Sequence, residues 1–167
     1  MDIGLLSQIC FEFYAFGNTT INMANLLVFY SRTGTTKKLA QQISAQLGCE
    51  VNEIMYEGKK PSFPAAAFQA TRKSTTQIKG DEQCPSNFDR LILLSPIWAG
   101  KLSTPARSYL EKYGKRINDL ALIATSKSGE QPGSIESDIK MFYDGPTTAR
   151  VFKSDTVNSG NIDLSWL

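Results

Sequence analysis

Three runs of consecutive apolar residues constrain the fold of this chain more than any other feature of its sequence. They are Leu26–Tyr30, Leu91–Leu94 and Leu120–Ala124. A strand covered on both faces needs apolar side chains at every position, whereas a strand with one solvent-exposed face alternates apolar and polar residues. The runs therefore predict three central strands of a sheet that carries a layer of structure on each face.

Segments with the spacing of amphipathic helices lie between these strands. The first contains Leu39, Ala40, Ile43 and Leu47 on one face and is followed by Gly48, a favourable left-handed C-cap. Further helices are expected at Ala65–Phe68 after Pro64, from Pro105 to Tyr113 before Gly114, and around Ile135–Phe142. Strands that alternate with helices imply right-handed crossovers and a parallel sheet.

Two shorter and more polar segments, Glu50–Ile54 and Arg150–Ser154, are predicted to add strands, the second of them at a sheet edge. The segment Lys79–Asn87 has the composition of a polar loop. The expected fold is thus an α/β doubly wound sandwich: a five-stranded parallel sheet with helices on both faces. The length of 167 residues suits one such domain.

Composition removes several classes of function. The net charge is +2 without a dense run of Lys or Arg, which argues against binding to nucleic acid. The absence of histidine excludes His-ligated metal and a Ser-His-Asp triad. Cys10, Cys49 and Cys84 are widely spaced and form no C-x-x-C, so no metal site is expected. Redox chemistry in this chain would therefore need a bound cofactor.

The first 22 residues differ from the rest of the chain. Ile3–Phe16 is rather apolar but contains Glu12 and is too short to span a bilayer. A basic n-region and a small-residue cleavage site, the marks of a secretory signal, are not clear. We therefore expect residues 1–22 to be a loosely attached extension and residues 23–167 to form the domain. We also expect no membrane insertion and a cytoplasmic location.

Ligands of doubly wound sheets bind outside the carboxyl ends of the strands. Of the segments there, Ser31-Arg32-Thr33-Gly34-Thr35-Thr36 is the sharpest signal, because it leaves a buried strand and enters a helix. Unpaired N–H groups and the helix dipole favour an anion at a helix start, four hydroxyl side chains could add donors, and the glycine permits a tight turn. The segment predicts a phosphate site, although Thr33 or Thr35 could instead simply cap the helix. Neither G-x-x-x-x-G-K-[ST] nor G-x-G-x-x-G is present.

Two further segments, Ser95–Ser103 and Thr125–Gln131, are expected to be loops at the same edge of the sheet. Trp98 follows a central strand at the place where a flat ring ligand would lie, and core packing is the other interpretation of this residue. The small polar residues that begin at Thr125 could meet the polar edge of such a ring, and an ordinary polar turn explains them equally well.

The phosphate loop is similar to the [ST]-x-T-G-x-T signature of flavodoxins, and Leu93–Gly100 resembles the second flavin loop of short-chain flavodoxin-like proteins. The resemblance covers Ala24–Ser154 and implies a flavodoxin-like sheet of order 2-1-3-4-5 with FMN bound noncovalently. It implies that the phosphate is held by Ser31, Thr33, Gly34, Thr35 and Thr36, with Arg32 at its outer edge. It implies that the ring is lined by Pro96, Ile97, Trp98, Ala99 and Gly100, and covered on its other side by Thr125 and Ser126.

One departure from the family pattern concerns the C-terminal segment. Asp155–Leu167 is too short for the usual closing helix, which we therefore expect to be short or missing. Trp166 and Leu167 are expected to cover a sheet edge hydrophobically.

Several functions fit these observations. The first is an FMN-binding electron-transfer protein that serves a redox partner protein or a small-molecule electron acceptor. The alternatives are an FMN-dependent NAD(P)H:quinone-type oxidoreductase and a flavin-free interaction domain. Lys101 and Lys127 flank the predicted ring loops, and a nearby cation would raise the reduction potential by stabilising an anionic reduced flavin.

A phosphatase is a further alternative, because Cys84–Arg90 has the C-x5-R spacing of a nucleophile and its phosphate-binding arginine. That chemistry needs a loop that leads from a strand into a helix. This segment instead leads into a predicted strand.

Overall fold

The computed structural model describes residues 23–72, 74–79, 83–130 and 132–167, and the predicted extension at residues 1–22 lies outside them. Its main sheet has five parallel strands: β1 (Asn25–Phe29), β2 (Glu50–Glu53), β5 (Arg90–Trp98), β7 (Leu120–Ser126) and β8 (Thr147–Lys153). They lie in the order β2-β1-β5-β7-β8. Counted among themselves along the chain, this is the order 2-1-3-4-5, so the predicted sheet is confirmed.

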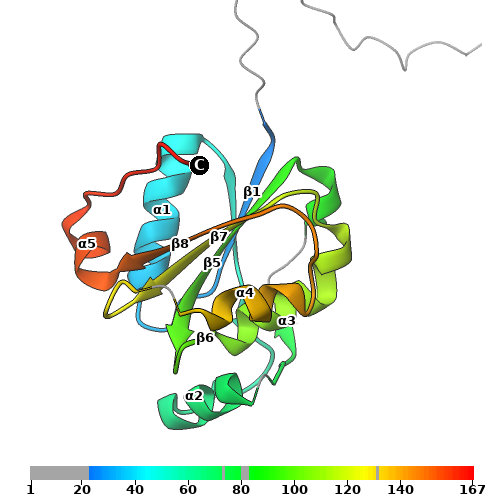
Figure 1. Ribbon diagram of the computed structural model, residues 1–167, viewed down its shortest axis with the longest axis vertical. Coiled ribbons are helices and arrows are strands. Elements are labelled where there is room, and N and C mark those ends of the chain that lie inside the picture. The colour runs from blue at the N-terminus through cyan, green and yellow to red at the C-terminus, as the bar shows by residue number, and fades with distance from the viewer. Residues whose placement is uncertain (1–22, 73, 80–82, 131) are drawn as a thin grey trace, which may run out of the picture.

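Helices cover both faces of the sheet (Figure 1). One face carries α1 (Thr35–Leu47) and α5 (Ser154–Ser159), and the other carries α3 (Thr104–Tyr113) and α4 (Ser134–Lys140). The 3₁₀ helices η1 (Pro85–Asn87) and η2 (Gly114–Arg116) precede β5 and follow α3. The expected three-layer sandwich is confirmed.

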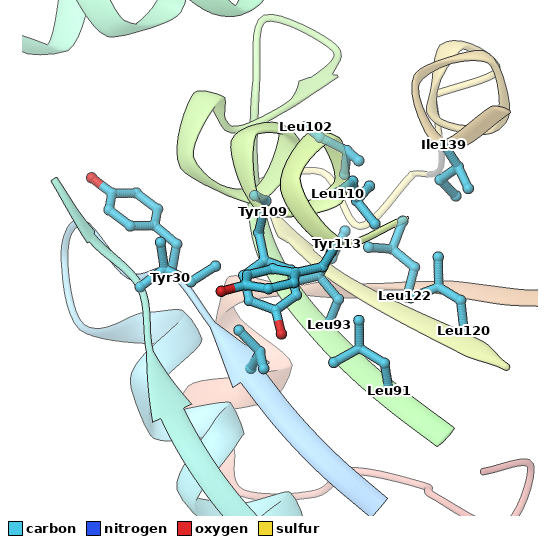
Figure 2. Packing of buried hydrophobic residues seen from close by; sticks show 14 of the residues in the cluster. Tyr30, Leu91, Leu93, Leu102, Tyr109, Leu110, Tyr113, Leu120, Leu122 and Ile139 are labelled. Atoms are coloured by element: carbon cyan, nitrogen blue, oxygen red, sulfur yellow. The ribbon is translucent and has the colours of Figure 1, made fainter. Parts of the chain in front are cut away.

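The apolar runs explain this layering, because successive residues of a strand point to opposite faces. In β5, Leu91 and Leu93 belong to the cluster under α3 and α4, whereas Ile92 and Leu94 belong to the cluster under α1. Figure 2 shows side chains of the first cluster between β5, β7 and α3. The same alternation holds in β1 and β7, so each run is apolar because both of its faces are buried.

The predicted end of α1 is confirmed. Gly48 adopts a φ of 62°, and its N–H donates to the Ser44 carbonyl at 2.8 Å. This left-handed cap stops the helix and turns the chain into β2. Helix α3 has Pro105 in its first turn, as predicted, but begins one residue earlier, at Thr104.

The prediction of a loop at Ser95–Ser103 is wrong. Strand β5 continues through Trp98, turns, and pairs in antiparallel fashion with β6 (Lys101–Leu102). Proline usually disrupts a strand because it has no N–H to donate. Pro96 is tolerated because the pairing of β1 with β5 ends at Leu94, so a donor is not needed on that side.

A small insert follows β2. Strands β3 (Met55–Tyr56) and β4 (Ile78–Lys79) pair in antiparallel fashion, and α2 (Phe63–Thr71) lies between them. The helix predicted around Ala65–Phe68 is confirmed. The expected polar loop Lys79–Asn87 is corrected at both ends, since β4 includes its first residue and η1 its last three; residues 80–82 lie outside the described residues.

The closing helix is short, as expected. Helix α5 has six residues, and the chain then packs Ile162, Leu164, Trp166 and Leu167 against the cluster under α1. Trp166 also lies 4.8 Å from the guanidinium of Arg150 on the edge strand β8. The hydrophobic cover predicted for Trp166 and Leu167 is therefore present, and it reaches the face of the sheet as well as its edge.

The packing of α1 makes a matched test of stability possible. Leu39 is fully buried, whereas Leu47 on the same helix is 38% exposed. Leu39→Ala should lower the free energy of unfolding by about 2–5 kcal/mol because it leaves a cavity against the sheet. Leu47→Ala should cost less than about 1 kcal/mol. Urea unfolding of both variants measures the difference, and equal losses would contradict this account of the core.

Candidate functional site

A cleft of about 410 Å³ opens at the carboxyl ends of β1, β5 and β7. These strand ends come from distant parts of the chain and meet because the strands are parallel and adjacent. The cleft is lined by the predicted site residues Arg32, Thr33, Thr35, Thr36, Pro96, Ile97, Trp98, Thr125 and Ser126. It is also lined by Phe63, Lys127, Ser128 and Ser154, which the predicted site did not include.

The predicted residues Ser31, Gly34, Ala99 and Gly100 are not part of this lining and instead shape the turns beside it. Gly34 is the N-cap of α1 with a φ of 95°, and no side chain caps the helix. The alternative that Thr33 or Thr35 caps α1 is therefore wrong. The Gly34 N–H donates to Ser31 Oγ at 3.1 Å, which closes the turn.

The start of α1 has the properties of an anion site. The first helical bond from the N-cap carbonyl joins the Lys38 N–H to the Gly34 oxygen at 2.9 Å. The N–H groups of residues 35–37 come before that bond and have no carbonyl four residues back within the helix. The first turn carries no acidic residue that would repel an anion. Thr33 and Thr35 line the cleft beside these groups and can add hydroxyl donors.

Thr36 and Thr125 join two of the predicted segments directly. Their Oγ1 atoms are 2.9 Å apart and buried, so one hydroxyl donates to the other. Residues 89 positions apart in sequence thus hold the start of α1 against the end of β7. Both side chains line the cleft and also fix its floor.

The end of the cleft opposite the start of α1 is lined by aromatic side chains. Trp98 is only 3% exposed, and its ring packs edge-on against Tyr30 with centroids 5.6 Å apart. The structure therefore gives Trp98 a large role in the core together with its place in the cleft wall. Phe63 at the start of α2 is 57% exposed and offers its ring to the cleft. The sequence signal for Phe63 was weak, because a phenylalanine before a proline is also common in ordinary helix starts.

Arg32 lies at this aromatic end. Its guanidinium carbon is 5.7 Å from the Phe63 ring centroid and 5.8 Å from that of Trp98. Its Nη2 donates to the Pro61 carbonyl at 2.9 Å. Arg32 thus connects the loop after β1 to the insert that carries α2.

The tip of the β5–β6 hairpin is held by α4. Ala99 and Gly100 form the turn with φ values of 47° and 77°, both in the left-handed region. Ser134 Oγ donates to the Gly100 carbonyl at 2.5 Å. Asp138, one helical turn further on, accepts the Leu102 N–H at 3.2 Å. Ala99 and Gly100 therefore determine where the hairpin presents Pro96, Ile97 and Trp98.

The two lysines predicted near a flavin differ in their surroundings. Lys101 Nζ lies 3.9 Å from Oδ1 of the buried Asp138, so its charge is partly compensated. Lys127 is exposed and lines the cleft. Its loop is fixed by Ser126, whose Oγ accepts the Gly129 N–H at 2.8 Å and whose carbonyl accepts a hydrogen bond from Ser154 Oγ at 3.0 Å.

Two tyrosines behind the aromatic end keep their protons at ordinary pH. Burial raises the pKa of Tyr56 to about 12. Burial, and to a smaller extent the neighbouring Tyr56, also raises the pKa of Tyr30, while Arg32 lowers it. Their rings meet edge to face with centroids 5.8 Å apart. Both phenols are thus neutral packing groups next to the cleft.

The C-x5-R segment does not form a phosphatase loop. Arg90 Nε donates to Asp119 Oδ2 at 2.5 Å, and its Nη1 donates to the Leu167 carbonyl, so the side chain is engaged elsewhere. Cys84 Sγ lies 3.1 Å from Ser86 Oγ, before η1 rather than at the start of an α-helix. Within residues 23–72, 74–79, 83–130 and 132–167 there is no metal-binding group of three or more Cys, Asp or Glu. No helix among these residues is both long and apolar enough to cross a membrane.

The link between Thr36 and Thr125 can be measured with a double-mutant cycle. Thr36→Val should lower the free energy of unfolding by about 1–3 kcal/mol, because the buried Thr125 hydroxyl loses its partner. Thr36→Val combined with Thr125→Val should cost less than the sum of the single changes. Denaturant unfolding of the four proteins tests this, and additive losses within about 0.5 kcal/mol would contradict the contact.

Solved structures resemble this chain, although no family model matches it and no curated protein matches it in sequence. A flavoprotein from Lactobacillus acidophilus NCFM in complex with FMN aligns with a TM-score of 0.68 and 22% identity, over 84% of this chain and 99% of that one. A putative flavoprotein from Bacteroides eggerthii gives 0.63 and 19%, over 82% and 94%. One from Bacteroides uniformis gives 0.62 and 17%, over 82% and 96%. Together with the strand order, these likenesses show that the chain has a flavodoxin-like fold.

Proposed function

We propose that this chain binds FMN in the cleft and works as an electron-transfer flavoprotein. The observation that carries the proposal is the cleft itself, which joins the start of α1 to an aromatic wall at the carboxyl ends of β1, β5 and β7. The similar flavoprotein from Lactobacillus acidophilus was crystallised with FMN, which supports the same ligand here. When bound, FMN supplies one- and two-electron transfer.

The residues of the cleft fit both halves of FMN. At one end, the N–H groups that begin α1 and the hydroxyls of Thr33 and Thr35 suit a dianionic phosphate. At the other end, Ile97, Trp98 and Phe63 provide apolar and aromatic surface for the ring. The volume of about 410 Å³ lies in the usual range for small-molecule sites.

The chemistry of the lining offers no group for general acid–base catalysis. The cleft is lined by Arg, Lys, Ser, Thr and apolar side chains, without Asp, Glu or Cys among the described residues. General acid–base catalysis needs a group whose pKa lies near the working pH, and the lining lacks one. Neither electron transfer nor hydride transfer to a flavin makes such a demand on the protein, so the rate of reduction by NADH or NADPH distinguishes a carrier from an oxidoreductase. We further propose a cytoplasmic location, which suits the free thiols of Cys49 and Cys84.

Phosphate recognition is testable with FMN and riboflavin, which differ only in the phosphate. The purified protein should be yellow, or become so with added FMN, and release FMN on denaturation. Thr35→Val, which keeps the shape of the side chain, should weaken FMN binding by roughly ten- to a hundredfold, because a bond to a charged group is lost. Riboflavin affinity should change little. Fluorescence titration measures both affinities.

Thr148→Val on the exposed strand β8 is the matched control and should leave both affinities unchanged. A protein that stays colourless with excess FMN would overturn the proposed function. Equal losses for FMN and riboflavin in Thr35→Val would place the phosphate elsewhere.

Lys127 should tune the bound flavin. Its cation stabilises an anionic reduced ring by about 1 kcal/mol at partial exposure, which corresponds to roughly 40 mV for one electron. Lys127→Gln should therefore lower the reduction potential by about that amount. A redox titration measures it, with Lys115→Gln on the distant η2 as the control. A potential that does not fall would show that Lys127 is too far from the ring to act on it.

A further inference from the structure

Helix α2 exposes aromatic side chains beside the cleft. Phe63 and Phe68 are 57% and 55% exposed, the highest values among the large hydrophobic side chains of the described residues. The buried side of α2 is provided by the small residues Ala66 and Ala70. Exposed phenylalanines are enriched in interfaces rather than on free surfaces. The outer side of α2 thus has the composition of a docking surface.

Positive charge is concentrated around these rings. Residues 57–79 contain five Lys or Arg and one Glu, a net charge of +4, whereas the whole chain has +2. The rest of the chain is therefore net negative. Lys59, Lys60 and Arg72 are exposed. The Arg72 guanidinium lies 4.3 Å from the Phe68 ring centroid, so charge and apolar surface occur side by side.

This surface is continuous with the proposed flavin site. Phe63 lines the cleft, and Arg32 connects the cleft to the insert through Phe63 and the Pro61 carbonyl. Lys60 Nζ lies 5.5 Å from the ring centroid of Tyr30 at the end of β1. A molecule that docks on α2 would therefore lie close to the ring end of the cleft, where electron transfer requires it to be.

The extent of the surface favours a protein over a small molecule. From Phe63 to Arg72 the chain advances about 13 Å along the helix axis, and of this stretch only Phe63 lines the cleft. A small molecule in the cleft would reach only the Phe63 end and leave Phe68 and Arg72 unused. Electron-transfer partners, by contrast, meet through small interfaces in which opposite charges steer the encounter.

We propose that Lys59, Lys60, Phe63, Phe68 and Arg72, here called the α2 surface, form the docking site for an acidic electron-carrier protein. The proposal rests on the proposed function and names the partner of that site by its chemistry. The basic side chains steer the acidic partner to the cleft, and the two phenylalanines provide the apolar centre of the contact.

The test uses the full chain loaded with FMN and a plant-type [2Fe–2S] ferredoxin, a small acidic electron carrier, as the probe. The variant Lys59→Glu/Lys60→Glu reverses two adjacent charges on the α2 surface. Lys115→Glu/Arg116→Glu makes the same change of charge on η2, at the C-terminal end of α3. Helix α3 starts beside the cleft and runs back along the sheet, so this control pair lies at the far end of the strands.

Stopped-flow spectroscopy should show that reduced ferredoxin reduces the wild-type flavin at a rate that falls steeply with ionic strength. Lys59→Glu/Lys60→Glu should slow this reaction at low salt by roughly tenfold or more and remove most of its salt dependence. The η2 control should stay within about twofold of wild type. Phe68→Ser, which changes no charge, should weaken ferredoxin binding in a calorimetric titration while the salt dependence remains.

The outcomes separate the two proposals. Failure to bind FMN, or to be reduced by dithionite when FMN is bound, overturns the proposed function. Normal reduction by dithionite with equal ferredoxin rates in both charge-reversal variants overturns the α2 surface. The α2 surface is also overturned if ferredoxin does not reduce the wild-type protein. The same holds if NADH or NADPH, rather than ferredoxin, reduces it rapidly. Oxidised cytochrome c, a basic electron acceptor, should show the opposite response and be reduced faster by reduced Lys59→Glu/Lys60→Glu than by the reduced wild type.

Discussion

The burial of β1, β5 and β7 on both faces is the constraint on which the rest of the structure depends. Each strand contributes side chains alternately to the cluster under α1 and to the cluster under α3 and α4. Neither layer is stable without the sheet between them, since each helix buries only one side. Parallel strands packed in this way end at one edge. The segments that follow β1, β5 and β7 therefore meet at this edge, and the cleft lies between them.

Polar contacts then convert that edge into a site. The Thr36–Thr125 bond fixes the start of α1 against β7, and Gly34 allows the preceding loop to turn tightly without a capping side chain. Helix α4 holds the β5–β6 hairpin through Ser134 and Asp138. These contacts place the first turn of α1, which carries no carboxylate, in the wall of the cleft. A site built from neutral donors can hold an anion without placing a cation beside it.

Much of this arrangement could be predicted from sequence. The apolar runs and helical spacing predicted the parallel sheet and its layers, because burial on two faces leaves a direct mark on residue type, whereas the strand order was implied by the resemblance to flavodoxins. The β5–β6 hairpin could not be predicted, because Pro96 is acceptable in a strand only where β1 has stopped pairing. Burial of Trp98 depends on Tyr30 from another strand, and the place of Phe63 in the cleft depends on how the insert folds back. Both the burial of Trp98 and the position of Phe63 depend on tertiary contacts, which no local sequence pattern predicts.

The positive charges of the molecule form two groups: those paired with acidic residues within the domain, and those exposed on the insert that carries α2. Lys101 faces the buried Asp138 and Lys37 pairs with Glu53 at 2.8 Å, so these cations near the strand ends are compensated within the domain. Lys59, Lys60 and Arg72 stand instead on an exposed insert with a single acidic residue. Compensated charges stabilise the domain and exert little force beyond a Debye length of about 8 Å. Uncompensated charges on an outer helix act on whatever approaches. On the proposed function, the fold thus keeps the forces that would hold a ligand in the cleft separate from those that would guide a partner toward it.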